Sequence, residues 1–258
     1  MLFNNIIYGP IHSRRLGLSL GVELMPLTHK LCTFDCVYCE CGWNTPVSHP
    51  QLPTREEVRA ALEAKLQSLS SAEGQGEALS TITFSGNGEP TLHPDFLGII
   101  QDTCALRDQY CPSAKVSVLS NSTQLGRPEV VEALQLCDNR ILKLDAATDT
   151  MMRRIDMPVN KQLDVATLIG WLRRFDGDFT LQTCFLRGEH AGQIIDNTTP
   201  EELGAWYKAV DSLHPKQIMI YVIDRKTPEE HLEKISRPEM ESIAAPLIAK
   251  GYEVIISA

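Results

Sequence analysis

The sequence lacks a long apolar segment, an excess of positive charge and any repeated or low-complexity tract. No apolar run approaches the length of a bilayer-spanning helix, which argues against a membrane partner. The first fifteen residues contain no charged region followed by an apolar one, so we expect no signal peptide. The formal net charge of −9 disfavours nucleic acid as a partner, because bulk binding to phosphates requires a basic surface, but a local basic pocket stays possible.

The composition is sufficient for a folded protein in a reducing compartment. A chain of 258 residues with 43% hydrophobic content can form one large α/β domain with a full core, or two small ones. Half of the eight cysteines crowd into one short segment, which is not the pattern of a secreted disulfide framework. We expect a cytoplasmic protein with a single domain over residues 1–258. Its parts are an N-terminal segment with the first strand (1–26), a cysteine loop (27–53) and further β/α units (54–258).

The cysteine loop contains the most informative pattern, LCTFDCVYCEC at residues 31–41. Cys32, Cys36 and Cys39 follow a C-x-x-x-C-x-x-C spacing, whereas a zinc site usually has four ligands in two pairs. Three thiolates in one loop suit a cubane iron–sulfur cluster, in which each cysteine binds one iron. One iron then has no protein ligand, and an open metal position is where chemistry takes place. Tyr38 adds an aromatic wall.

Two other interpretations of this loop stay open: a structural zinc loop completed by Cys41 or His49, and three reduced thiols without a metal. The spacing, with an aromatic residue before the last cysteine, resembles the radical S-adenosylmethionine (radical SAM) superfamily. The resemblance implies a [4Fe–4S] cluster whose open iron is chelated by S-adenosylmethionine. It also implies reductive cleavage of that cofactor to a 5′-deoxyadenosyl radical, which takes hydrogen from a substrate.

Strands and helices alternate about six times after the cysteine loop, which predicts an α/β fold with one parallel sheet and outer helices. The capping boxes TREE, TPEE and SRPE predict helix starts at Thr54, Thr199 and Ser236. The pattern itself fits an open doubly wound sheet or an incomplete barrel, and the resemblance implies a partial (β/α)6 TIM-like barrel. Seven strands are predicted, at 19–24, 81–85, 115–120, 140–144, 179–185, 217–222 and 253–257.

Unusual polar residues follow several of these strands, where ligands of parallel sheets bind. Gly86, Asn87, Gly88 and Glu89 belong to the sequence GNGEP, which is similar to the G-G-E-P element that receives the amino group of SAM, with Asn87 inserted. The loop also fits an ordinary βα turn. The other residues expected at the cofactor are Ser120 and Asn121 for a carboxylate or ribose, Asp145 for ribose hydroxyls, and Tyr221 and Val222 for adenine.

Basic residues before the first strand and after later strands form a second candidate set. Gathered at one strand-end surface, they would suit an anionic substrate such as a phosphate or carboxylate. Unrelated surface charges are the alternative. The residues are His12, Arg14, Arg15, Arg187 and Arg225.

The segments YGPIHSRRLGLSLGVELMP and KLCTFDCVYCECG resemble a bacterial radical SAM group related to the wyosine-base synthases, which modify transfer RNA. Those enzymes carry a second cluster on upstream cysteines, but no cysteine precedes Cys32 here, so the tRNA reaction is not transferred. The substrate is open, as a small molecule or a macromolecule, and we expect an external electron donor of flavodoxin or ferredoxin type. Alternatives are an activating enzyme that makes a glycyl radical on a partner protein, tRNA-base modification, and a non-catalytic metal or electron-transfer protein.

Overall fold

The computed structural model describes residues 2–13, 15–70 and 77–258; Arg14 and most of the predicted loop 71–77 lie outside them. Two short 3-10 helices span Pro90–Leu92 and Arg173–Phe175. The α-helices are α1 (Arg55–Ser70), α2 (Phe96–Tyr110), α3 (Pro128–Leu136), α4 (Asp149–Ile155), α5 (Val165–Leu172), α6 (Pro200–Leu213) and α7 (Arg237–Ala249). The strands are β1 (Ile7–Ser13), β2 (Gly17–Val22), β3 (Thr81–Phe84), β4 (Lys115–Ser120), β5 (Asn139–Lys143), β6 (Thr180–Cys184), β7 (Leu186–His190), β8 (Gln193–Asp196), β9 (Gln217–Tyr221), β10 (Leu232–Lys234) and β11 (Val254–Ser257).

The main sheet has the strand order β1-β2-β3-β4-β5-β6-β9-β11, and a smaller sheet has the order β10-β7-β8. Parallel β/α units along the main sheet confirm the predicted α/β class with a partial TIM-like barrel fold. The chain forms two compact units. The first unit comprises Met1–Cys32, Asn44–Ser120 and Gln124–Arg140, and the second comprises Thr33–Trp43, Asn121–Thr123 and Ile141–Ala258.

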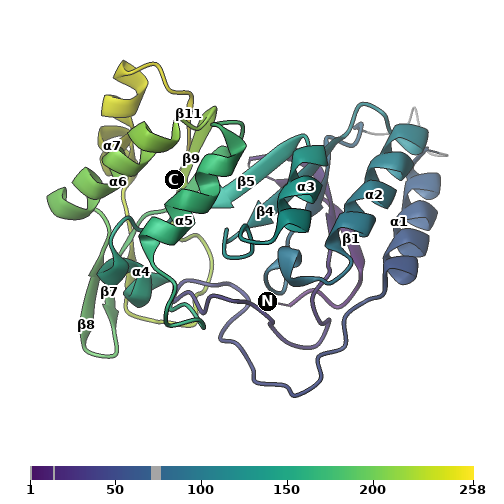
Figure 1. Ribbon diagram of the computed structural model, residues 1–258, viewed down its shortest axis with the longest axis horizontal. Coiled ribbons are helices and arrows are strands. Elements are labelled where there is room, and N and C mark those ends of the chain that lie inside the picture. The colour runs from purple at the N-terminus through teal and green to yellow at the C-terminus, as the bar shows by residue number, and fades with distance from the viewer. Residues whose placement is uncertain (1, 14, 71–76) are drawn as a thin grey trace. The chain divides into compact units, whose positions relative to one another are not determined.

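In the first unit, β1 pairs antiparallel with β2, and β2, β3 and β4 run parallel. Alternation along these strands separates an apolar face from a polar one. Leu20, Ile82 and Val116 are fully buried register neighbours, and α1, α2 and α3 lie side by side next to the strands (Figure 1). On the other face the hydroxyls of Ser19 and Thr83 are 2.8 Å apart. The polar side chains of these strands therefore share one face, away from the apolar contacts.

In the second unit, β6 pairs parallel with β5 and β9, and β9 pairs parallel with β11. The smaller sheet is antiparallel, with β7 between β8 and β10. Asp164 caps α5 by accepting from the Thr167 N–H at 2.7 Å, and Thr199 caps α6. The C-terminal helix α7 begins with a full capping box between Ser236 and Glu239.

The strand pattern corrects the sequence prediction in two places. The first strand spans Gly17–Val22 instead of 19–24, and β1 precedes it as an antiparallel partner. The strand β1 contains Gly9-Pro10, and a Gly-Pro pair in a sequence argues against a strand. The short strands β7, β8 and β10 were not predicted, since their polar sequences LRGEH, QIID and LEK carry little strand signal. The predicted capping box at Thr54 and Glu57 is present, with both of its hydrogen bonds.

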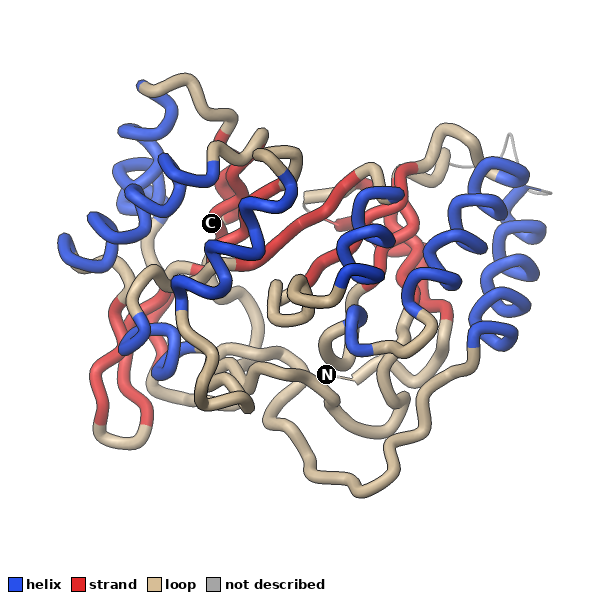
Figure 2. The backbone as a smooth tube through the Cα atoms, viewed as in Figure 1, coloured by secondary structure: helices blue, strands red, loops and turns tan. Residues whose placement is uncertain are grey.

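The segment between β2 and α1 contains no helix or strand, apart from a single bridge between Leu31 and Gly88, and Figure 2 shows it as a long loop. Within the described part of the chain, none of the helices has the length and apolar character needed to cross a bilayer.

Candidate functional site

The first cysteine of the predicted cluster motif, Cys32, belongs to the first unit. Its backbone N–H donates to the Asn44 side-chain oxygen, and its carbonyl accepts from the Asn44 amide nitrogen, both at 3.1 Å. The preceding residue, Leu31, forms the bridge to Gly88. This part of the cysteine loop is therefore held through the backbone, and the Cys32 side chain is half-buried.

The second and third cysteines lie in the second unit, on one turn. The Cys39 N–H donates to the Cys36 carbonyl at 3.0 Å. The turn is anchored to the end of α4, because the Val37 N–H donates to the Ile155 carbonyl at 2.9 Å. The Cys36 thiol donates to Asp156 at 3.4 Å, and burial raises the pKa of that thiol. No role was predicted for Asp156 from the sequence.

The donor set fits an iron–sulfur cluster better than a hard cation, since soft thiolates favour iron–sulfur or zinc sites. Among the described residues, no three His, Cys, Asp or Glu side chains are gathered into a metal-binding group. The fit therefore rests on the donor chemistry and on the turn that presents Cys36 and Cys39. Both would bind as thiolates, so metal binding must release the Cys36 proton.

The loop Gly86–Glu89 follows β3 in the first unit and requires glycine at two positions. Gly86 has φ +145°, and a Cβ there would overlap the carboxylate of Glu23. A Cβ on Gly88 would overlap the backbone carbonyl of Leu31. The Leu31 N–H donates to the Asn87 carbonyl at 3.0 Å, and the Glu89 N–H donates to the Leu31 carbonyl at 3.2 Å. The loop is thus packed against the residue that precedes the first cysteine.

The inserted residue of this loop, Asn87, is fully buried and its side chain serves the fold. It accepts from the Phe3 N–H and donates to the Phe3 carbonyl, both at 2.8 Å, and also donates to the Pro26 carbonyl at 3.0 Å. A role of Asn87 in binding a cofactor therefore stays a prediction, and such a contact would involve its backbone and not its side chain.

A buried carboxylate that the sequence analysis missed, Glu23, lies directly after β2. It is 1% exposed and accepts from the N–H groups of Asn87 at 2.6 Å and Met25 at 2.7 Å. Burial raises the pKa of Glu23 to about 7, against the opposing effect of these hydrogen bonds. Ser19, Gly21 and Glu23 are every second residue along the sequence and so lie on the same polar face. This periodicity is the sequence signal that could have identified Glu23.

The structure brings together two of the predicted cofactor residues, Glu89 and Ser120. One oxygen of the Glu89 carboxylate accepts from the Ser120 hydroxyl at 2.9 Å and from the Thr91 N–H at 3.1 Å. The Thr91 hydroxyl donates to the same oxygen. Ser120 is the last residue of β4 and Glu89 lies in the loop after the neighbouring parallel strand β3, so these two polar groups meet at one edge of the first unit.

Asn121 belongs to the second unit. Its side-chain nitrogen donates to the Thr33 hydroxyl at 2.8 Å, and its oxygen accepts from the Thr123 N–H at 3.1 Å. Ser122 has φ +70° and donates to the Lys143 carbonyl at 2.9 Å. Asn121 therefore fixes the segment that carries the first residues of the cysteine turn.

The densest polar group of the second unit surrounds Asp145. One oxygen of Asp145 accepts from the Tyr38 hydroxyl, and the other accepts from the Cys184 N–H at 2.8 Å. The Lys143 ammonium lies 3.3 Å from Asp145 and donates to the Tyr38 hydroxyl. Burial and the Asp145 charge raise the pKa of Tyr38, so its hydroxyl stays protonated and donates.

Lys143 and Asp156 complete this group, and neither was assigned a role from the sequence. Burial opposes the charge of Lys143, but Asp145 and its neighbours outweigh burial and raise the pKa of that ammonium. Burial and the nearby Asp145 raise the pKa of Asp156, which favours a proton on that carboxyl. Lys143 and Asp145 therefore form a buried ion pair, with the ammonium 3.3 Å from the carboxylate.

The two residues predicted to contact adenine lie next to this group. The Tyr221 ring meets the Tyr38 ring edge to face, with centroids 6.5 Å apart. Val222 is buried, and its N–H donates to the Ser257 carbonyl at 3.2 Å. Contact of Tyr221 and Val222 with adenine stays a prediction, and Val222 is 2% exposed in this structure.

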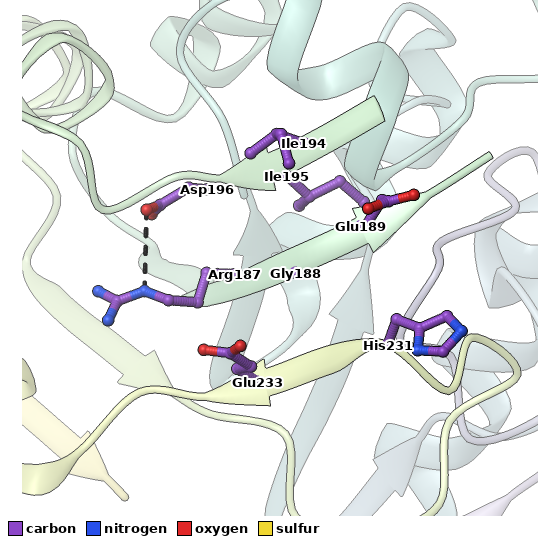
Figure 3. Close-up of a pocket in the computed structure, with 8 residues that line it drawn as sticks. All are labelled: Arg187, Gly188, Glu189, Ile194, Ile195, Asp196, His231 and Glu233. Atoms are coloured by element: carbon purple, nitrogen blue, oxygen red, sulfur yellow. Dashed lines mark ion pairs between the residues drawn. The ribbon is translucent and has the colours of Figure 1, made fainter. Parts of the chain in front are cut away.

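Three of the residues predicted to bind an anionic substrate have acidic partners. Arg187 donates to Glu239 at 3.0 Å. It also lies 3.7 Å from Asp196, and Figure 3 marks this ion pair with a dashed line. Arg225 pairs with Glu40 at 2.7 Å. His12 lies 3.5 Å from Glu77, the Arg15 N–H donates to the Ser13 hydroxyl, and Arg14 lies outside the described residues.

An open cavity of about 400 Å³ is lined by strands β7, β8 and β10. Besides Arg187, its charged lining includes Glu189, Asp196 and Glu233 (Figure 3). This cavity is more acidic than basic, and it does not support a cationic patch at Arg187.

Comparisons with known proteins agree with these observations. No protein-family model matches the chain. A UPF0026 protein of Methanocaldococcus jannaschii is 30% identical over an alignment of 260 residues, which covers 97% of this chain and 72% of that protein. The chain belongs to the UPF0026 family. A UPF0026 protein of Helicobacter pylori strain J99 is 28% identical over 186 residues, or 71% of this chain and 57% of that protein.

A protein of Brachyspira hyodysenteriae named GTPase Obg is 30% identical over an alignment of 241 residues, which covers 91% of this chain. The chain spans only 32% of that protein and 57% of the Helicobacter relative. Part of each of these relatives therefore has no counterpart in this chain.

Several solved structures share the fold. Streptococcus suis SuiB, bound to the precursor peptide SuiA, has a TM-score of 0.62 at 13% identity, covering 92% of this chain and 48% of that one. TYW1 with a bound lysine–pyruvate adduct has a TM-score of 0.61 at 15% identity, covering 90% and 73%. The radical SAM enzyme HemN of Escherichia coli has a TM-score of 0.56 at 16% identity, covering 88% and 51%. This UPF0026 chain has the fold of radical SAM enzymes.

Proposed function

We propose that this protein is a radical SAM enzyme that binds a [4Fe–4S] cluster through Cys32, Cys36 and Cys39. Such a cluster, reduced by an external donor of flavodoxin or ferredoxin type, would supply the electron for cleavage of the C5′–S bond of S-adenosylmethionine. The products would be methionine and a 5′-deoxyadenosyl radical, which would take a hydrogen atom from the substrate to give 5′-deoxyadenosine. The observation that carries this proposal is the three-cysteine spacing in a chain with this fold.

The residues around the strand ends support roles in holding SAM. The backbone of Gly86–Glu89 receives the ammonium group, because carbonyls accept from ammonium. Ser120 and Asn121 serve the carboxylate or ribose. Asp145 accepts from ribose hydroxyls, Tyr38 closes one side of the site, and Tyr221 and Val222 flank adenine. The Ser120 hydroxyl and the Cys184 N–H hold the Glu89 and Asp145 carboxylates, respectively, in one orientation.

The substrate is proposed only by class, as a molecule or polypeptide segment with one accessible C–H bond. An anionic substrate has weaker support, since Arg187 and Arg225 have acidic partners. The net charge of −9 also gives little support to tRNA as the substrate.

Anaerobic reconstitution with iron and sulfide, followed by dithionite and SAM, tests the proposal. We expect about four iron atoms per chain, as one cubane cluster requires, and formation of 5′-deoxyadenosine and methionine by mass spectrometry. Cys36→Ala should lose both. Cys104→Ala is the matched control, because this half-buried thiol lies on α2, outside the motif, and both signals should persist.

Purified protein that retains zinc instead of iron, or iron-replete protein that leaves SAM intact under dithionite, would contradict the proposal and favour a non-catalytic metal protein. Cleavage that requires a second protein, with a glycyl radical detected there by EPR, would identify the activating-enzyme alternative.

A further inference from the structure

Glu23 lies beside the loop that the proposed function assigns to the SAM ammonium. Val22, the last residue of β2, is the register partner of Phe84, the last residue of β3. The chain therefore leaves two neighbouring parallel strands at the same level, at Glu23 and at Ser85-Gly86. This edge of a parallel sheet is where ligands bind, and Glu23 follows one of the two strands there.

Backbone N–H groups hold both oxygens of the Glu23 carboxylate. One oxygen accepts from the Asn87 N–H at 2.6 Å and the other from the Met25 N–H at 2.7 Å. Gly86 leaves the space for this contact, because any Cβ on Gly86 would overlap the carboxylate. The Glu23 side chain is 1% exposed and both of its oxygens already accept from backbone N–H groups, so we expect its influence on binding to act through the loop backbone.

The peptide unit that Glu23 holds joins Gly86 to Asn87. A trans peptide is planar, with its C=O and N–H on opposite sides. Holding the Asn87 N–H toward Glu23 therefore turns the Gly86 carbonyl away from Glu23. A hydrogen bond on the N–H side also polarises the carbonyl and strengthens it as an acceptor.

We infer that Glu23 is a positioning residue that orients and polarises the Gly86 carbonyl to accept a hydrogen bond from the ammonium group of SAM. The inference rests on the proposed function of this loop. Glu23 should therefore determine affinity for the methionine part of the cofactor and have little effect on affinity for its nucleoside part.

The test uses the reconstituted, iron-replete protein and measures two dissociation constants, for SAM and for 5′-methylthioadenosine, which lacks the ammonium and carboxylate. Glu23→Gln keeps the shape but places an NH2 group against one of the two N–H donors. At pH 8, above the pKa of Glu23 of about 7, we expect the Kd of this variant for SAM to rise about tenfold, as for loss of a charge-assisted hydrogen bond, with less than about a twofold change for 5′-methylthioadenosine.

Glu202→Gln is the matched control. Glu202 is a mostly buried carboxylate at the start of α6 that accepts from the Thr148 hydroxyl at 2.7 Å, and neither Kd should change. If Glu23→Gln does not fold with a full cluster, Glu23→Asp, which keeps the charge but withdraws it by one methylene, is measured in the same way.

Equal weakening of both ligands would show that Glu23 only supports the fold, and an unchanged Kd for SAM would also overturn the inference. Either result differs from failure of the proposed function itself, in which the wild-type protein would bind no SAM.

Discussion

The two units hold their candidate ligand groups in different ways. In the first unit, the carboxylates of Glu23 and Glu89 accept from backbone N–H groups and neutral hydroxyls. In the second, Asp145 also accepts from one backbone N–H, that of Cys184, but its other contacts are the Tyr38 hydroxyl and the buried Lys143 ammonium. The first arrangement depends on backbone shape and glycine, and the second depends on charge balance. Substitutions that change backbone shape should therefore affect mainly the first unit, and substitutions that remove a charge should affect mainly the second.

The largest effect is expected from Gly88→Ala, because the new Cβ would overlap a backbone carbonyl, that of Leu31, which cannot rotate away. We expect a loss of more than about 5 kcal/mol in the free energy of unfolding, seen as a failure to obtain folded protein. Gly204→Ala on α6 is the control, since nothing lies within 4 Å of the position its Cβ would take and alanine favours helix. A stable, soluble Gly88→Ala protein would show that the loop can move away from Leu31.

The next effect tests charge balance in the second unit. Lys143→Met removes the ammonium and leaves the fully buried Asp145 carboxylate without its cation. Breaking such a buried pair should lower the free energy of unfolding by about 3–5 kcal/mol in denaturant titrations. Lys216→Met, which breaks an exposed pair with Asp178, should cost less than about 1 kcal/mol. Similar costs for the two variants would mean that Asp145 does not depend on the cation.

A pH effect comes from Glu23 in the first unit. Its folded pKa of about 7 lies above the ordinary value of 4.5, so the folded chain keeps a proton that the unfolded chain releases. The free energy of unfolding should therefore fall as pH rises from about 4.5 to about 7, by up to about 3 kcal/mol, and stay level above that. Denaturant titrations at pH 5 and pH 7.5 measure the difference, and Glu23→Gln should remove this part of it. An unchanged slope in Glu23→Gln would assign the effect to other groups.

The smallest effect on stability is expected from Arg225→Ala, because its ion pair with Glu40 is exposed and should contribute less than about 1 kcal/mol. Arg225 was predicted from the sequence to bind substrate. If it does, Arg225→Ala should abolish substrate turnover and leave the Kd for SAM unchanged. The turnover measurement requires an identified substrate. Loss of both would place Arg225 in support of the cysteine segment that carries Glu40.

Much of the fold could be predicted from the sequence, because capping residues and turn residues act on neighbouring residues in the chain. Thr54, Asp164 and Ser236 each make the side-chain cap that their spacing predicts. The strands β4 and β9 were found nearly to the residue, since their apolar runs end at polar groups. The antiparallel partner β1 was missed, because pairing with β2 is a tertiary property and Gly9-Pro10 reads as a turn.

The candidate site was only partly readable. The spacing of glycines and cysteines in the sequence predicts their roles, as at Gly86 and Cys36. A single buried acid such as Glu23 or Asp156 carries no motif, and its importance appears only when the chain folds and removes it from water. For the same reason, the ion pairs that neutralise Arg187 could not be foreseen, because Glu239 lies far along the chain from it.

The edge strand β1 has one more consequence. Its register with β2 shifts between Tyr8 and Ile11, and Pro10 in that interval has no N–H to offer. An outer strand with an irregular ladder and a missing donor is a poor template for a strand of another molecule. This end of the sheet should therefore resist edge-to-edge aggregation, and replacing Pro10 with valine should make concentrated protein more prone to form fibrils.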